Sequence, residues 1–316
     1  MLRYLLKRLA SAIVTLWLLV TIVFLIVNIL PGDIARKILG PFATQESVAA
    51  YRAEYGLDLP LWRQYLSSMW NIVTLDFGSS YLQKKPVTDI VFPALLRSGK
   101  LAILAFVITI PVSILAGIIA ARRQDKLSDR AIVNVGLASS SIPEFVSAAV
   151  LLSVFCVHWK IGKVFANPPE GTSLVGQLQY LLMPALAMAI AYFGYLARMT
   201  RAGVISAQNA DYARTATMKG MSQGEVMRRH ILRNALAPTI TVISIQIGYL
   251  FGGIIGVEKV FNYPGLGTEM LNAAKGRDIP LLQGAVLVVG LIYMLSTLAA
   301  DLLIAYLNPR VRLETK

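Results

Sequence analysis

Six stretches of this 316-residue chain are apolar for about twenty residues each, and they restrict the possible folds more than any other feature. A helix rises about 1.5 Å per residue, so about 20 apolar residues cross the roughly 30 Å hydrocarbon layer of a membrane. The mean hydropathy of +0.63 agrees with such spans. The sequence therefore predicts an all-α polytopic membrane protein with six transmembrane helices, near residues 9–31, 101–121, 132–158, 181–200, 237–258 and 281–307.

The scarcity of cysteine and histidine argues against redox and zinc chemistry. Cys156, His158 and His230 supply neither a disulfide framework nor a Cys/His metal cluster. The net charge is +13, but no RNA- or DNA-binding motif accompanies it, so nucleic acid is not an expected partner. Basic residues in a polytopic chain usually flank the spans and face anionic membrane lipid or the cytoplasm.

The distribution of basic residues predicts the orientation in the membrane. The two termini and the two loops on their side hold 17 Lys and Arg, whereas the two short loops on the other side hold 5. Cytoplasmic loops carry the excess of positive charge, so both termini are predicted to be cytoplasmic. The predicted parts are a tail and first span (1–31), an extracytoplasmic insertion (32–100), a five-helix core (101–307) containing a cytoplasmic segment (201–236), and a cytoplasmic tail (308–316).

The predicted insertion contains two stretches with helical spacing of apolar residues. An amphipathic stretch near residues 44–55 stops at Gly56, and the sequence LDLPLWRQYLSSMW follows it. Two interpretations stay open for this region: a lid packed on the helix bundle, or a surface that meets a partner outside.

The cytoplasmic segment includes the basic stretch ARTATMKGMSQGEVMRRHILRNALAP, residues 213–238. Gly220 is expected to end a first helix in the left-handed conformation, and Ser222 with Glu225 forms a capping-box pattern that starts a second. The segment thus predicts a helix, a turn and a helix, with an ordinary amphipathic connector as the alternative. One helical face carries only small side chains, which would let another backbone approach closely: Ala207, Ala210, Ala213 and Thr217.

This segment resembles the cytoplasmic loop of ATP-binding-cassette (ABC) importer permeases. Their pattern has Glu-Ala-Ala, three residues, Gly, nine residues, then Ile-x-Leu-Pro, and Ala216, Gly220 and Leu232 match it here. Arg214 and Arg233 replace its Glu and Pro. The form ARTATMKGMS…RRHILRNALAP is similar to the peptide and nickel branch of the family.

Further blocks resemble the first, B-type permease subunit of that branch. They are MLRYLLKRL at the amino terminus, LPGD (30–33), YGLDLPLWRQY (55–65), DFGSSY (76–81), GGIIGVEKVFNYPGLG (252–267), KGRDIPLLQG (275–284) and NPRVR (308–312). The resemblance implies a type I ABC importer permease fold in the bacterial cytoplasmic (inner) membrane. It also implies that the chain is a transport subunit and not an enzyme.

The same resemblance implies a set of partners. It implies a second homologous permease subunit in a heterodimer, two ATP-binding subunits and an extracytoplasmic solute-binding protein. The chain itself has no G-x-x-x-x-G-K-[ST] phosphate loop, so it is expected to bind no cofactor, with ATP and Mg on the partner ATPase. The segment around 215–223 would be the coupling helix that contacts this ATPase, through Thr215, Ala216, Met218, Lys219, Gly220, Met221 and Ser222.

The candidate translocation path centres on an ionisable residue inside the third span. Glu144 lies about 18 Å into that span by helix rise, where a carboxylate is costly and usually faces a bundle interior or water. Pro143 beside it frees backbone groups and kinks the helix, and Ser141 is nearby. A pathway role, for a substrate with a cationic group, and a buried structural hydrogen bond both stay open.

The outer end of the fifth span is the candidate outer gate or binding-protein contact. Its residues are Glu258, Asn262, Pro264 and Gly265, with a plain turn as the alternative. The expected substrate is a peptide or similar small solute, with nickel, oligosaccharides or opines as alternatives. Rival classes are a membrane enzyme, an ion-coupled secondary transporter and a membrane scaffold. The sequence shows no catalytic constellation and no repeated halves.

Overall fold

The computed structural model describes residues 2–29, 33–169 and 171–307. Most of the LPGD block, the NPRVR block and the predicted tail 308–316 lie outside these residues. Within them no β-strand occurs, and the only extended pairing is an isolated bridge between Ser79 and Pro86. The predicted all-α fold is confirmed.

Among the described residues, five helices are long and apolar enough to cross a membrane, and a sharply bent pair makes a sixth if it counts as one span. The five are α1 (Leu2–Ile29), α5 (Val87–Arg122), α8 (Leu174–Gln208), α12 (Ala237–Val260) and α14 (Ile279–Leu307). The prediction placed the second span near residue 101 and the fourth near residue 181, but α5 and α8 begin earlier. Polar residues such as Asp89 and Arg97 do not stop a helix, so the helix extends beyond the apolar window that predicted it.

The chain divides into two compact units. The first unit comprises Met1–Ser98 and Pro264–Leu291, and the second comprises Gly99–Tyr263 and Ile292–Lys316. The predicted boundary at residue 100 falls within α5, close to the junction of the units.

Three short helices of the first unit follow α1: α2 (Ile34–Leu39), α3 (Gln45–Glu54) and α4 (Leu61–Val73). The Asp33 side chain caps α2 by accepting from the Ala35 N–H at 3.0 Å, and it also pairs with Arg52 at 2.6 Å. Burial opposes ionisation of Asp33, but the hydrogen bond and charge of Arg52 outweigh it and hold the pKa below its usual value. These contacts fix α2 against α3.

A buried carboxylate connects two distant parts of the first unit. Asp278 is fully buried just before α14 and accepts from the Ser80 hydroxyl, from the Leu82 N–H at 3.1 Å and from the Leu281 N–H at 3.2 Å. Burial, with the nearby Asp278 charge, raises the pKa of Tyr81 to about 12. The bonds of Asp278 hold the turn at residues 80–82 against the start of α14.

Helix α8 is the centre of the second unit, where α6, α7, α11 and α12 all pack against it. Several of these contacts are backbone to backbone, because a Cβ at Gly136 of α6 would lie 2.9 Å from the Cα of Gly194 on α8. Likewise, a Cβ at Gly203 would overlap the carbonyl of Ala235. In lipid the hydrophobic effect does not drive helices together. Close approach of their backbones instead provides favourable van der Waals contact.

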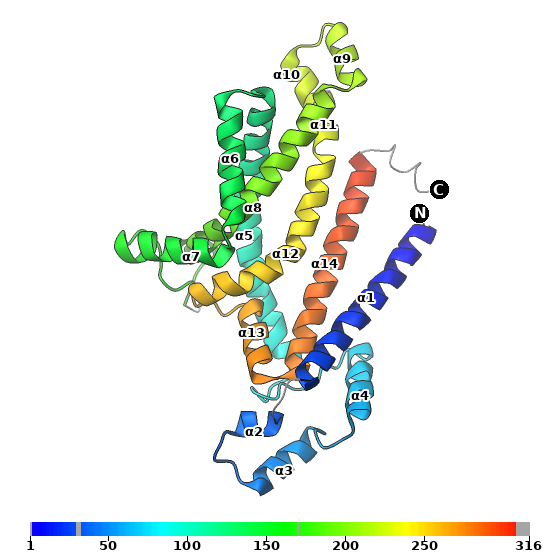
Figure 1. The fold of residues 1–316 in the computed structure, drawn as a ribbon, viewed down its shortest axis with the longest axis vertical. Helices are drawn as coiled ribbons and strands as arrows, with labels where there is room; N and C mark the ends of the chain where they lie inside the picture. Colours follow the sequence, from blue (N-terminus) through cyan, green and yellow to red (C-terminus); the bar gives the residue numbers. More distant parts are fainter. Residues whose placement is uncertain (1, 30–32, 170, 308–316) are drawn as a thin grey trace. The chain divides into compact units, whose positions relative to one another are not determined.

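The third apolar stretch forms the bent pair. Helix α6 (Leu127–Ser141) ends before Pro143, and α7 (Glu144–Leu151) continues into a π-helical turn, η1 (Leu152–His158), at an angle of 97° to α6 (Figure 1). The predicted effect of Pro143 was a kink within one span. The structure has a complete break there, because the ring removes a backbone donor and keeps Ile142 extended.

An ion pair joins α6 to α8. Asp129 is 3% exposed and binds Arg201 through two hydrogen bonds, Nε to Oδ1 and Nη2 to Oδ2, each 2.6 Å long. Asp129 also accepts from the Asp125 N–H at 2.9 Å. The bidentate geometry fixes both helices at this end of the second unit.

We expect replacement of Arg201 by Met to destabilise the second unit strongly. The change leaves the Asp129 charge buried without its partner, which costs about 3–5 kcal/mol. The matched control is Arg229→Met, because Arg229 pairs with Glu225 at 2.9 Å while its side chain is 62% exposed. An exposed pair of this spacing contributes about 0.3–0.5 kcal/mol. Thermal unfolding of the purified protein in detergent measures both, and equal losses in the two variants would contradict the structural role of the Asp129 pair.

Candidate functional site

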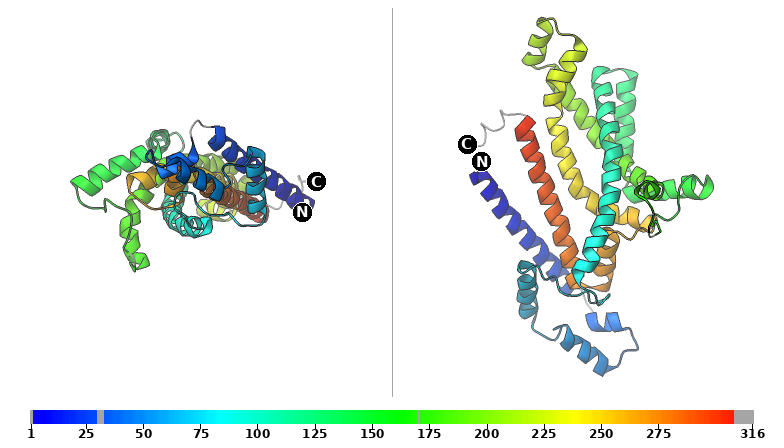
Figure 2. Two further views of the ribbon diagram at one scale, coloured as in Figure 1. Left: turned by 90° about the horizontal axis from the view of Figure 1, so that it is seen from below. Right: turned by 180° about the vertical axis from the view of Figure 1, so that it is seen from behind.

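Residues 211–235 form the predicted helix and tight turn, followed by further helical turns. Helix α9 (Asp211–Met218) ends at Lys219, and Gly220 has φ +81°, the left-handed region that favours glycine. The Ser222 hydroxyl then caps α10 (Gln223–Val226) by accepting from the Glu225 N–H at 3.3 Å. A π-helical turn, η2 (Met227–Ile231), and α11 (Leu232–Ala235) lead into α12. The right panel of Figure 2 shows these elements beyond the ends of α8 and α12.

The small side chains of this segment face the chain's own core, where they let α8 and α9 approach each other closely. Ala213 is 3% exposed and Ala216 is 5% exposed. Both pack in one cluster with Val204 and Ala207 of α8 and with Val226. The predicted continuous face is interrupted as well, because Ala210 lies between α8 and α9 as the N-cap. The alanines therefore hold α9 on the protein.

The exposed surface of the segment consists of other predicted residues. Met218 is 79% exposed, a large fraction for an apolar side chain. The turn around it is exposed at Thr215, Lys219, Gly220 and Ser222, while Met221 is half-buried against the alanine cluster. This turn stands on a packed base and presents an apolar tip.

The α6–α7 break places the predicted pathway residues together. Pro143 is the N-cap of α7 and Glu144 is its first residue, while Ser141 donates to its own helix at the Leu137 carbonyl, 2.9 Å away. Glu144 is half-buried against α12. A Cβ placed on Gly253 would lie 2.7 Å from Glu144 Oε1, so α12 approaches α7 at the end of the Glu144 side chain.

Tyr192 of α8 is a residue that sequence reasoning missed at this point. The same Cβ position on Gly253 lies 3.1 Å from the Tyr192 hydroxyl, so this hydroxyl and the Glu144 carboxylate converge. Tyr192 is 4% exposed, its ring stacks on Phe106 at 6.4 Å, and its hydroxyl has no hydrogen-bond partner among the described residues. The only sequence signal for Tyr192 was a polar-tipped aromatic in an apolar span. Its neighbours are distant in sequence.

The predicted outer-gate residues fall on both sides of the unit boundary. In the second unit, Glu258 is fully buried, while Asn262 is exposed with φ +49°. In the first unit, the Pro264 carbonyl accepts from Arg97 at 3.3 Å, and Gly265 is the N-cap of α13 (Leu266–Gly276). Because Glu258 is buried, its side chain is not available to a partner at the surface. Only Asn262 of this set is exposed.

No group of three or more His, Cys, Asp or Glu side chains in the described part of the chain could hold a metal ion. The arrangement at the α6–α7 break offers a carboxylate and a phenol hydroxyl. Their chemistry suits hydrogen bonding and charge pairing with a solute.

The apolar spans, the break at Pro143 and the turn at Gly220 belong to a polytopic membrane protein, and comparisons with known proteins identify its family. Residues 113–313 match the model of the binding-protein-dependent transport system inner membrane component, and residues 1–97 match the amino-terminal model of the same kind of protein. The chain belongs to this family of binding-protein-dependent transport system inner membrane components.

Two curated relatives cover almost the whole chain. It is 37% identical over 312 residues to the glutathione transport system permease protein GsiC of Escherichia coli (strain K12), covering 99% of both chains. It is 36% identical over 309 residues to a putative peptide transport system permease protein of Brucella abortus (strain 2308), covering 98% of both. The crystal structure of an amino acid ABC transporter with histidines aligns with a TM-score of 0.46 at 19% identity, covering 71% of this chain and 94% of that one. A likeness this weak adds nothing to the family assignment.

The family confirms the predicted class of function. The chain is a permease subunit of a binding-protein-dependent ABC importer, a multi-pass inner membrane protein and not an enzyme. Such a subunit works with an ATPase and a substrate-binding protein.

We expect Gly253→Ala to disturb the contact between α7 and α12. The new methyl group would displace the end of the flexible Glu144 side chain and press on the hydroxyl of buried Tyr192, and overpacking of this mild kind costs about 1 kcal/mol. The adjacent Gly252 is the matched control, because a Cβ there meets nothing within 4 Å. The thermal midpoint of the purified transporter should fall for Gly253→Ala and stay unchanged for Gly252→Ala. Similar midpoints for the two variants would contradict the close approach.

Proposed function

We propose that this permease couples to an ATP-binding subunit through the turn at residues 215–222. The observation that carries the proposal is the contrast within this segment. Ala213 and Ala216 fix α9 to α8 by burial, while Met218 at the tip is 79% exposed. A rigid base with an exposed apolar tip can transmit a displacement of the tip to α8. Thr215, Lys219, Gly220 and Ser222 complete the contact surface, and Met221 supports it from below.

The proposed assembly contains a second, homologous permease in a heterodimer, two ATP-binding subunits and an extracytoplasmic solute-binding protein. ATP and Mg bind to the ATP-binding subunits, and this chain binds no cofactor. Both termini and residues 201–236 face the cytoplasm, and residues 32–100 form the extracytoplasmic insertion. Asn262, the exposed residue of the predicted outer-gate set, contributes to the outer contact with the binding protein.

The proposed mechanism is alternating access. Closure of the ATP-binding pair moves the turn at Gly220, α8 follows because α9 is packed against it, and the spans open outward to receive the solute. ATP drives this change through its different affinities for the two states. No bond is made or broken by this chain.

The proposed substrate is a peptide or a similar small solute with a cationic group. Relatives named as glutathione and peptide permeases support the substrate class. The convergence of the Glu144 carboxylate and the Tyr192 hydroxyl beside Gly253 supports the cationic group, since a carboxylate in a span is favourable only with a partner or water. The pair would meet the solute where α6 and α7 separate.

We expect Gly220→Ala to lower ATP-driven uptake several-fold. A Cβ at φ +81° strains the turn by about 1–2 kcal/mol and shifts its tip, although the space around it is open. The matched control is Gly224→Ala, which also enters open space but within the regular helix α10. Uptake into vesicles holding the complete transporter measures both, and Gly220→Glu adds bulk and charge at the same position. Normal assembly and uptake in Gly220→Glu would refute the coupling role.

We expect Glu144→Gln to reduce uptake of peptides with a free amino group more than uptake of their amino-acetylated forms. The amide keeps the size of the side chain but removes the charge that would pair with an ammonium group. Tyr192→Phe tests the second half of the pair, because it deletes only the hydroxyl. Competition uptake assays with the two peptide forms give the ratio, and normal uptake by Glu144→Gln would exclude a charge contact with the solute.

A further inference from the structure

Helix α4 carries an exposed apolar stripe. Four side chains follow one another at intervals of four, four and three residues, so they share one face of the helix. They are Trp62 (59% exposed), Leu66 (57%), Trp70 (69%) and Val73 (75%). Two tryptophans on the open face of a 13-residue helix are unusual for a surface in water.

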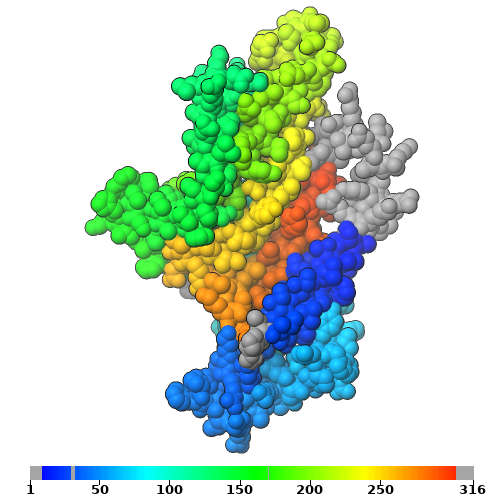
Figure 3. All heavy atoms as spheres, viewed as in Figure 1, coloured from blue at the N-terminus to red at the C-terminus, as the bar shows by residue number. Residues whose placement is uncertain are grey.

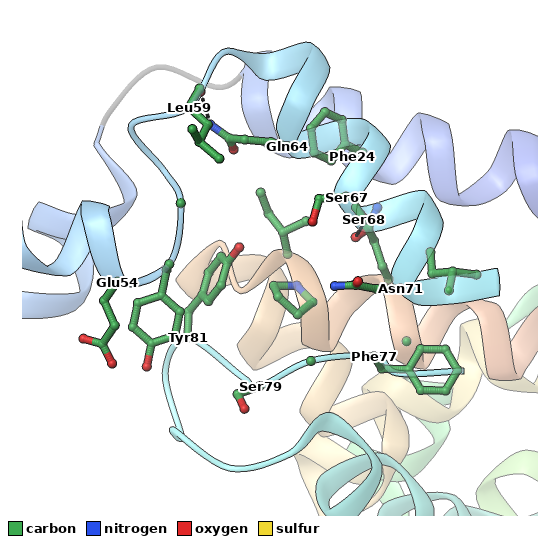
Figure 4. A pocket seen from close by; sticks show the side chains of 18 residues that line it. Phe24, Glu54, Leu59, Gln64, Ser67, Ser68, Asn71, Phe77, Ser79 and Tyr81 are labelled. Carbon is green, nitrogen blue, oxygen red and sulfur yellow. Dashed lines mark hydrogen bonds between the residues drawn. The ribbon is translucent and has the colours of Figure 1, made fainter. Parts of the chain in front are cut away.

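Apart from Arg63, the polar side chains of α4 lie on the side away from the stripe. Gln64 donates to the Leu59 carbonyl at 2.8 Å, and Ser68 donates to Gln283 of α14 at 2.7 Å. With Ser67 and Asn71 they line a cavity of about 370 Å³, and Figure 4 shows these side chains on its α4 wall. A helix on a water-soluble surface has the opposite arrangement, with its apolar face inward.

The contact between α4 and α1 fixes the height of the stripe. The Tyr65 hydroxyl lies 2.9 Å from the Thr21 hydroxyl, and the Tyr65 ring packs edge-on against Phe24 at 5.5 Å. Figure 3 shows α4, in light blue, directly beside the outer end of α1. The apolar window of α1 is Leu9–Ile29, 21 residues. It is about 31 Å long by helix rise, and Thr21 lies about 12 Å inward from its end.

At that height α1 itself exposes apolar side chains. Ile22 is 52% exposed, Leu25 48% and Ile26 55%. In a membrane span, apolar side chains that nothing in the same chain covers are open to lipid. The polar contacts of α4 with α1 and α14 are paired hydrogen bonds, as hydrocarbon surroundings require. The stripe of α4 therefore continues a surface that meets lipid.

We propose that α4 is a membrane-inserted helix whose Trp62–Leu66–Trp70–Val73 stripe lies among the acyl chains of the leaflet on the insertion's side. The occupant of this face is lipid. Trp side chains are common near the boundary between headgroups and hydrocarbon, so a helix that carries two of them suits a position close to it. Arg63 lies 5.1 Å over the Trp62 ring, at the edge of the stripe, and its charge can reach the headgroups. Burial of α4 in the membrane holds residues 32–100 at a fixed depth.

Spin labels provide the test, because Cys156 is the only cysteine of the chain. In a Cys156→Ser background, Leu66→Cys and Trp70→Cys each receive a nitroxide, and Glu46→Cys on exposed α3 is the aqueous control. The complete transporter is reconstituted in phosphatidylethanolamine–phosphatidylglycerol vesicles, and uptake verifies assembly. Power saturation then compares collisions with oxygen, which concentrates in lipid, and with a water-soluble nickel chelate.

The proposal requires labels at 66 and 70 to collide mainly with oxygen and the label at 46 mainly with nickel. Dominant nickel collisions at 66 and 70 would place the stripe in water. Low collisions with both reagents would mean that the second permease or the binding protein covers it. Either result overturns the proposal.

A second measurement needs no label on the stripe. In transporter reconstituted with brominated lipids, the native protein should lose more tryptophan fluorescence than a Trp62→Phe, Trp70→Phe variant. The difference isolates the two stripe residues from the other tryptophans of the assembly. Equal quenching of the two proteins would also overturn the proposal.

Discussion

Backbone contact between helices holds the second unit together, since spans in lipid gain nothing from hydrophobic association. Gly136 meets Gly194 and Gly203 meets the Ala235 carbonyl, and both contacts are made by α8. The Asp129–Arg201 pair locks the same helix to α6. Because α8 also carries Tyr192 and supports α9, the proposed coupling surface and the proposed solute contact are attached to one continuous helix of 35 residues. A displacement of the coupling surface can therefore move the part of α8 that carries Tyr192.

The break at Pro143 places Glu144 in contact with the elements that pack on α8. A straight third span would bury Glu144 along its length, whereas a 97° bend makes Glu144 the first residue of a separate helix packed on α8 and α12. Gly253 allows α12 to approach the carboxylate within van der Waals distance. Because these atoms are already in contact, a movement of α8 or α12 changes the surroundings of Glu144 directly.

The sequence predicted those features that depend on neighbouring residues. Apolar windows indicated the spans, and Gly220 with Ser222 indicated the turn, because both signals are local. It could not predict the convergence of Glu144, Tyr192 and Gly253, which lie on three different helices. Nor could it predict that Ala213 and Ala216 are buried within the chain, because small side chains suit a contact within the chain as well as one with a partner. The sequence also could not predict that α4 exposes its apolar stripe, because periodicity identifies an amphipathic helix but not which side meets lipid.

The proposed coupling requires that the tip of the turn at residues 215–222 touches the ATP-binding subunit. A Cys156→Ser, Met218→Cys variant of the complete transporter, labelled at residue 218 with a photoactivated cross-linker, tests it most directly. Met218 is 79% exposed, so the label should not disturb the fold. Illumination followed by mass spectrometry should identify the ATP-binding subunit as the attached protein, with a yield that changes when ATP is added. Attachment to lipid alone, or to no other protein, would contradict the account.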